Sequence, residues 1–263
     1  MSVALSVRIY SEDKNEQSAA AIETLLGKLL ECFDGHTRVV SFEAEKDNWA
    51  LHGNRWRAQK PDVRLQNETR ALVRGIANEL RKPSGHVVFH YDGDTLWADQ
   101  AEAPLRADFT RVMRRGVREA LDARTSARPR PERSRLPAPP LSDKEIEERL
   151  GRLIECAPFY SIEAWLYQAT ARAKELCMSE HEGRDVERFE AWGEDRELLD
   201  EVRAPKESVC LRDQHNAELA KRVPVAEVLA VGKSLAGFRD ALRACPTLAL
   251  RMKVDARVQG MAR

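Results

Sequence analysis

The sequence lacks three features that mark whole classes of protein. It has no apolar run near the roughly 20 residues that a membrane-spanning helix needs, and its first residues lack the basic and then apolar pattern of a secretory signal. It also has no excess of either charge, since 43 Lys and Arg residues face 43 Asp and Glu residues. These absences argue against a membrane protein and a general nucleic-acid coat, and we expect a cytoplasmic protein.

Aromatic residues and cysteines are also few. Aromatics make up 6% of the chain, which does not suggest an RNA-stacking surface. None of the five cysteines forms a CxxC pair, so the sequence signals neither a zinc site nor a disulfide framework, and we expect small core or surface residues. With 43% hydrophobic residues, the 263-residue chain is able to bury a real core, and one to two domains are expected.

Apolar runs of strand type alternate with helical patterns in the first half of the chain. Strands are expected at 3–10, 37–42 and 85–91, and helices at 18–33, at 68–81 after an Asn67 cap, and at 108–121. Residues 43–61 read as a loop or irregular excursion. This alternation is typical of an α/β fold with a mainly parallel sheet and helices on both faces.

A basic, proline-rich stretch divides the chain. Residues 124–142 hold five prolines and five arginines, a density that prevents both helix and central strand, so we expect a linker or exposed loop. The α/β core then spans 1–123, and 143–263 forms a mostly helical portion that completes the domain. Helices are expected there at 143–154, 161–177, 195–202, 216–222, 225–231 and 234–245.

Acidic residues follow two of the expected strands. Asp92 and Asp94 come directly after the strand at 85–91, and Glu12 and Asp13 follow the first strand. Because the carboxyl ends of parallel strands meet at one edge, these side chains are candidates for a site that holds a hard cation such as Mg²⁺. The alternative is that Asp92-Gly93-Asp94 is an ordinary turn.

These pieces resemble the Toprim domain of topoisomerases, primases and OLD-type nucleases. VRIYSEDKNE places Glu12 in the acidic position after the first strand, and VVFHYDGD supplies Asp92 and Asp94. FYSIEAWLYQA is similar to a motif of the RloB and AbiL-like Toprim proteins of bacterial phage defence, which maps its acidic residue onto Glu163. Asp13 stands where the family has glycine, so Glu16 is the alternative position for the first acid.

The resemblance implies a metal-dependent nuclease that cleaves phosphodiesters with Mg²⁺ or Mn²⁺. Glu12, Asp92, Asp94 and Glu163 would be its metal ligands and catalytic residues. It also implies an anti-phage, abortive-infection role with a partner ATPase. This chain has no nucleotide-binding loop of its own, because Gly232-Lys233-Ser234 lacks the upstream glycine and strand of a P-loop.

Basic residues could guide nucleic acid to that site. Nine arginines and three acids fall between Arg111 and Arg135, a local asymmetry in a neutral chain. Arginine binds phosphate with two parallel hydrogen bonds, so this segment could attract nucleic acid, or it could be a solubilising linker or a surface for an acidic protein. The nucleic-acid candidates are Lys14, Arg128, Arg130, Arg133 and Arg135.

Two other interpretations remain open at this point. The chain could be a non-catalytic interaction subunit that keeps the sheet and uses its basic loop to dock a partner. It could also be a phosphotransferase with Asp92 as nucleophile. His90 could contact substrate or be an ordinary buried strand residue, and Trp165 is expected in the core.

Overall fold

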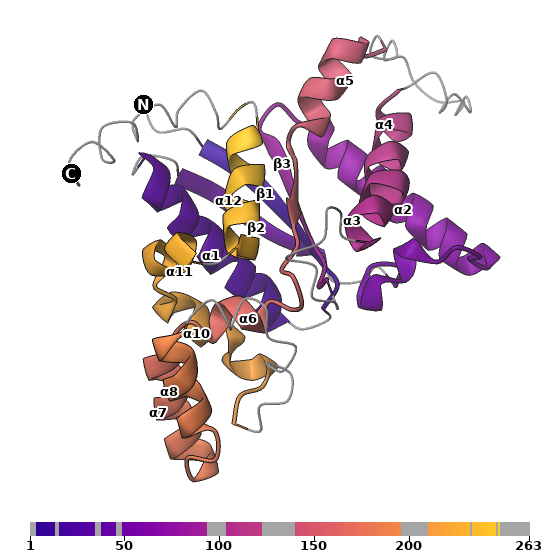
Figure 1. Ribbon diagram of the computed structural model, residues 1–263. Helices are drawn as coiled ribbons and strands as arrows, with labels where there is room; N and C mark the ends of the chain where they lie inside the picture. Colours follow the sequence, from indigo (N-terminus) through magenta and orange to yellow (C-terminus); the bar gives the residue numbers. More distant parts are fainter. Residues whose placement is uncertain are drawn as a thin grey trace.

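The protein is built around a parallel sheet (Figure 1). The computed structural model describes residues 4–13, 16–34, 38–45, 49–93, 104–122, 140–195, 210–231, 233–245 and 247. Within them, four parallel strands lie in the order β2-β1-β3-β4. They are β1 (Ala4–Ser11), β2 (Arg38–Glu45), β3 (Gly85–His90) and β4 (Leu153–Cys156). The expected α/β class, with a helical C-terminal part, is confirmed.

The first two crossovers run in opposite directions from β1. Helix α1 (Glu16–Asp34) leads from β1 to β2 on one side, and α2 (Val63–Arg81) returns the chain to β3 on the other side of β1. Where strand order reverses in this way, the connections leave the sheet on opposite faces and open a crevice at the carboxyl ends of the strands. The ends of β1 and β3 therefore flank the place where a site is expected.

Each face of the sheet has its own hydrophobic core. Alternate side chains of β1 and β3 point to opposite faces, so Val7, Ile9 and Val88 pack with α1, whereas Tyr10 and Phe89 pack with α2. The leucines of α1 are buried at helical spacing, as their periodicity predicts. Each fully buried leucine contributes about 1.5–3 kcal/mol relative to an exposed one.

Helix α2 begins earlier than its sequence suggests. Asp62 accepts a hydrogen bond from the Leu65 N–H at 2.7 Å and caps the helix, so the expected cap at Asn67 is wrong. Before it, the 3₁₀ segment η1 (His52–Arg57) occupies part of the stretch predicted to be irregular. The helix expected from Asp108 is a continuous helical run that starts earlier, comprising α3 (Pro104–Asp108), the π-helical η2 (Phe109–Arg114) and α4 (Arg115–Leu121).

The C-terminal part contains a fourth strand that the sequence pattern did not predict. Helix α5 (Asp143–Leu150) stops at Gly151, and Leu153–Cys156 then pairs with β3 as strand β4. Four residues are too few to show a strand period, which is why 143–154 reads as one helix in the sequence. Helix α5 begins with a capping box between Ser142 and Glu145, at the end of the predicted linker.

The remaining helices surround one end and one face of the sheet (Figure 1). The predicted helix at 161–177 is broken at 167–169, and a helix not predicted at all follows it. The helix expected at 195–202 lies outside the described residues except for Asp195, which ends the preceding helix. The elements are α6 (Glu163–Leu166), α7 (Thr170–His181), α8 (Val186–Glu194), η5 (Asp213–His215), α10 (Asn216–Arg222), α11 (Val225–Val231) and α12 (Lys233–Ala244).

A disulfide bond joins Cys177 at the end of α7 to Cys210, which precedes η5. The expectation of unpaired cysteines is therefore wrong for this pair, because two residues 33 positions apart in sequence meet in the fold. Cys156 and Cys245 are free and buried. None of the helices in the described ranges has the length and apolar character to cross a bilayer.

Candidate functional site

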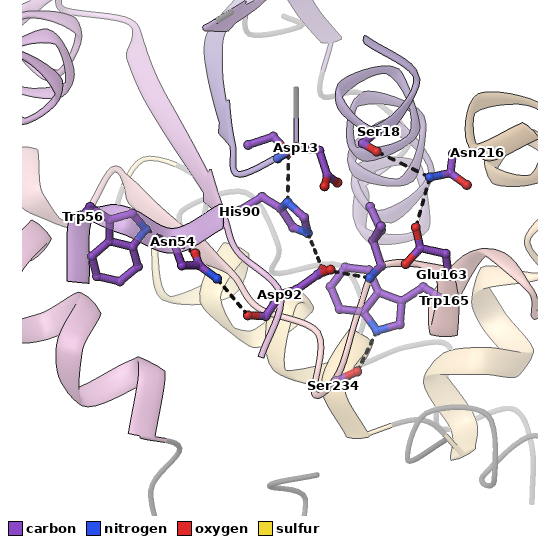
Figure 2. A network of polar contacts seen from close by, with 12 residues as sticks. Asp13, Ser18, Asn54, Trp56, His90, Asp92, Glu163, Trp165, Asn216 and Ser234 are labelled. Carbon is purple, nitrogen blue, oxygen red and sulfur yellow. Dashed lines mark hydrogen bonds and ion pairs between the residues drawn. The ribbon is translucent and has the colours of Figure 1, made fainter. Parts of the chain in front are cut away.

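The ends of β1 and β3 bring a serine, a histidine and an aspartate together. Figure 2 shows the histidine and the aspartate, His90 and Asp92. Ser11 and His90 are paired across the two strands, and Ser11 Oγ lies 3.0 Å from His90 Nδ1. Asp92 follows two residues later on the same side of the chain, with its Oδ1 at 3.4 Å from His90 Nε2. Ser11 Oγ also accepts a hydrogen bond from the Asp13 N–H at 3.3 Å, which links the end of β1 to the imidazole.

Asp92 is held in place by backbone contacts from two other elements. Its Oδ1 accepts a hydrogen bond from the Ile162 N–H at 3.1 Å, immediately before α6. Its backbone carbonyl accepts from Asn54 Nδ2 at 3.4 Å, in η1. With 3% of its surface exposed, Asp92 is a buried carboxylate whose position is fixed by its neighbours.

Asp13 reaches the same cluster from β1. It follows Ser11 by two residues, and Ser18 of α1 hydrogen-bonds its carboxylate. Figure 2 shows Asp13 and Ser18 near His90. Burial raises the pKa of Asp13, and the nearby charge of Asp92 raises it further, while His90 and the Ser18 bond act in the opposite direction. Asp13 therefore binds a proton more tightly than a free aspartate does.

Glu163 closes the cluster from α6. Its Oε1 accepts a hydrogen bond from Asn216 Nδ2 at 3.3 Å, and the same amide donates to Ser18 Oγ at 3.4 Å. Burial and then the charge of Asp92 raise the pKa of Glu163, although a hydrogen bond from Ser161 opposes this. Asn216 begins α10 and is 1% exposed, so the bridge between α1 and α6 is internal.

The imidazole of His90 lies among these three carboxylates. Burial alone lowers its pKa, but the hydrogen bond to Asp92 and the charges of Asp92, Asp13 and Glu163 outweigh burial, so the pKa of His90 is raised overall. The histidine and the acids thus stabilise one another electrostatically. A cation of higher charge would offset the same excess of negative charge more fully.

The donor set suits a hard divalent cation. Carboxylate, amide and hydroxyl oxygens are the ligands that Mg²⁺ prefers. Two buried oxygens of the cluster, Glu163 Oε2 and Asn216 Oδ1, have no hydrogen-bond partner among the described residues. Asp13, Asp92 and Glu163 are not among the groups of described residues whose ligand atoms lie close enough together to hold a metal directly; the group found is Cys177, Asp185 and Cys210, and its two cysteines form a disulfide. The arrangement therefore fits an ion held by one or two carboxylates with water completing its shell, which is common for Mg²⁺.

The predicted site residues have different positions. Asp92 and Glu163 belong to the cluster. Glu12 lies at the bend that follows β1 and is 9% exposed, and its backbone carbonyl accepts from His52 Nδ1 at 3.1 Å. The alternative, Glu16, is exposed at the start of α1. The other predicted site residues lie outside the described residues; they are Asp94, Lys14, Arg128, Arg130, Arg133 and Arg135.

Asp13 was predicted only as a neighbour of Glu12, and three further members of the site were not predicted from the sequence. For Ser11 a signal existed, because alternation from Ile9 places it on the His90 side. For Ser18 and Asn216 there was none, since Asn216 contacts a residue 53 positions away. Trp165 is a core residue as expected, and its Nε1 donates to Ser234 Oγ at 2.6 Å, which gives that serine a structural role.

Comparison with protein-family models, with curated proteins and with solved structures finds no match to this chain.

Proposed function

We propose that this protein is a Mg²⁺- or Mn²⁺-dependent nuclease whose acidic site is formed by Asp13, Asp92 and Glu163. The observation that carries the proposal is the group of buried oxygens at the strand-order reversal, some of which have no partner among the described residues. Buried carboxylates that repel one another are stabilised by a bound cation. The resemblance of the acidic motifs to Toprim proteins supports phosphodiesters as the substrate.

The same resemblance supports a wider role. We include in the proposal a function as effector of an anti-phage system, a partner ATPase and a cytoplasmic location. The Cys177–Cys210 disulfide sets a condition on that location, because the cytoplasm generally keeps thiols reduced. In that compartment the pair would be formed only on oxidation.

Each residue of the cluster has a distinct task in this proposal. Asp92 binds the ion, and its contacts with Ile162 and His90 orient it before the ion arrives. Asp13 is only half-buried and its raised pKa suits it to accept a proton from attacking water. Glu163, whose carboxylate accepts a hydrogen bond from Asn216, supplies a further carboxylate from α6. A bound divalent ion would polarise a phosphoryl oxygen and stabilise the charge that develops on it.

The experiment has two parts. The first measures the Tm of the protein with and without Mg²⁺ or Mn²⁺, and the second measures cleavage of short single-stranded DNA, duplex DNA and RNA. An ion at a hundredfold excess over its Kd stabilises the folded state by about 2.7 kcal/mol. For a chain of this size that corresponds to a Tm increase of about 5–10 °C. Asp92→Asn retains an oxygen for the Ile162 N–H but loses the charge, so we expect it to abolish both this increase and cleavage while leaving the metal-free fold intact.

Glu187→Gln is the matched control, because Glu187 is exposed in the first turn of α8 and the substitution removes one negative charge far from the cluster in sequence. Glu180 is unsuitable for this purpose, since it accepts a hydrogen bond from His215 at 3.1 Å. If the wild-type protein shows no metal-dependent stabilisation and no cleavage, the acidic cluster is not a metal site and the interaction-subunit interpretation replaces the nuclease. A trapped phosphoaspartate at Asp92 would instead support the phosphotransferase.

A further inference from the structure

A basic and aromatic surface lies around η1, the segment whose Asn54 contacts the backbone carbonyl of Asp92. The guanidinium carbons of Arg55 and Arg64 lie 4.7 Å and 4.6 Å from the centre of the Trp49 ring. Trp49 is half-buried and both arginines are exposed. Residues 49–64 contain four basic residues and one acid, Asp62, whose carboxylate is bound by the Leu65 N–H. We call Trp49, Arg55 and Arg64 the Trp49 surface.

The two arginines of this surface differ from many others in the chain. Arg57, Arg106 and Arg111 each form an ion pair with a carboxylate. Within the described ranges, Arg55 and Arg64 form none and are held only against the indole ring. Stacking on an aromatic ring restricts a guanidinium but leaves its N–H groups able to bind an anion, so less entropy is lost when an anion binds.

The Trp49 surface is rigidly connected to the acidic cluster. Arg55 follows Asn54, a residue with a positive φ of 55° whose side chain contacts the Asp92 carbonyl. The next residue, Trp56, donates to Asn54 Oδ1 at 3.3 Å and packs edge-on against Phe89 of β3. One element, η1, thus contacts the backbone of Asp92 with one residue and presents Arg55 with the next.

We propose that the Trp49 surface binds the phosphate backbone of a nucleic-acid strand that extends from the acidic cluster. This inference rests on the proposed nuclease function and names the part of the protein that holds its substrate. Planar guanidinium groups match phosphate oxygens. Val63, next to Arg64, is 73% exposed and offers apolar contact to a sugar or base at the same place.

Binding without cleavage tests the proposal directly. Fluorescence anisotropy of short labelled single-stranded DNA, duplex DNA and RNA would be measured in EDTA at several salt concentrations. We expect Arg55→Gln with Arg64→Gln to weaken binding about tenfold or more and to lower the slope of log affinity against log salt by about 1.4–1.8, as the loss of two phosphate contacts predicts. Arg70→Gln with Arg74→Gln is the matched control, because it removes the same charge from exposed positions farther along α2.

Trp49→Leu tests whether the orientation of the two guanidinium groups matters in addition to their charge. It keeps both arginines but removes the ring on which they stack, so affinity should fall while the salt slope stays nearly unchanged. Melting curves of every variant show whether the fold is retained. Arg55→Lys with Arg64→Lys should recover the slope but only part of the affinity, because lysine lacks the planar fork.

Several results would overturn the proposal. One is an Arg55/Arg64 double variant that binds like the Arg70/Arg74 control. Another is competition by poly-glutamate as effective as that by an unlabelled oligonucleotide, which would indicate a surface for acidic proteins. If the Arg55/Arg64 variant retains wild-type binding but the wild type still shows metal-dependent melting and cleavage, the Trp49 surface is refuted and the nuclease stands. If binding depends on Arg55 and Arg64 but no metal effect exists, the surface stands and the nuclease is refuted.

Discussion

Reduction of the Cys177–Cys210 disulfide is expected to destabilise the C-terminal part of the protein. The bond closes a loop of 33 residues. In the chain-entropy relation, closing a loop of that length restricts the unfolded chain by about 12.5 cal/mol/K, or about 3.7 kcal/mol at 25 °C. For a chain of this length a loss of that size lowers Tm by about 7–15 °C.

The effect should extend to the acidic cluster. Cys210 leads through Leu211 into η5 and then into Asn216, the residue that bridges Ser18 and Glu163. Releasing Cys210 removes a covalent restraint from this segment, so α10 should exchange amide hydrogens faster in the reduced protein. Metal-dependent stabilisation should decrease at the same time, because Asn216 positions Glu163.

The measurement is a thermal melt with and without a reductant. Thiol alkylation and intact-mass analysis of the same samples report whether the disulfide is reduced. Cys177→Ala should have a low Tm that the reductant does not change. Cys245→Ala loses a free buried thiol, so its response to the reductant should equal that of the wild type. The reasoning is refuted if the wild-type Tm is the same in both conditions although alkylation shows that Cys177 and Cys210 have changed state.

Three further perturbations follow from the buried polar groups. The pKa values of Asp13, Glu163 and His90 are raised above 3.8, 4.5 and 6.5, so each group holds its proton more tightly in the folded state. Metal-free melts should show stability falling as the pH rises through these raised pKa values, and added Mg²⁺ should offset that loss most at high pH. Arg152→Met removes the guanidinium that donates to four backbone carbonyls between Leu80 and Gly85 and should cost about 3 kcal/mol or more in urea unfolding, with Arg152→Lys intermediate. Asp13→Asn should weaken Mg²⁺ binding in calorimetry more than Glu12→Gln does, and the reverse order would return Glu12 to the site.

The sequence predicted those elements whose hydrophobic period is long enough to be distinctive. The helix at 18–33 shows its buried face over several turns, and the strand at 85–91 has the β-branched and aromatic residues Val87, Val88 and Phe89 at its centre. Strand β4 has only four residues and takes its identity from pairing with β3, which no local pattern reveals. The break before α7 likewise depends on packing. No residue in 161–177 indicates that a helix ends and another begins there, and no side chain caps the start of α7.

The acidic site was only partly predictable, because its residues come from two sources, the ends of strands and the packing of helices. Residues at the ends of strands follow from chain direction and side-chain alternation, so Asp92 is expected and Asp13 could have been preferred to Glu12 by counting in steps of two from Ile9. The family pattern favoured Glu12 because it aligns motifs by residue type rather than by the face each side chain occupies. Asn216 and Ser18 join the site through the packing of α10 on α1, which depends on the whole core. In a site formed where the strand order reverses, the residues at the strand ends are therefore predictable from the sequence. The residues that helices contribute are known only from the tertiary structure.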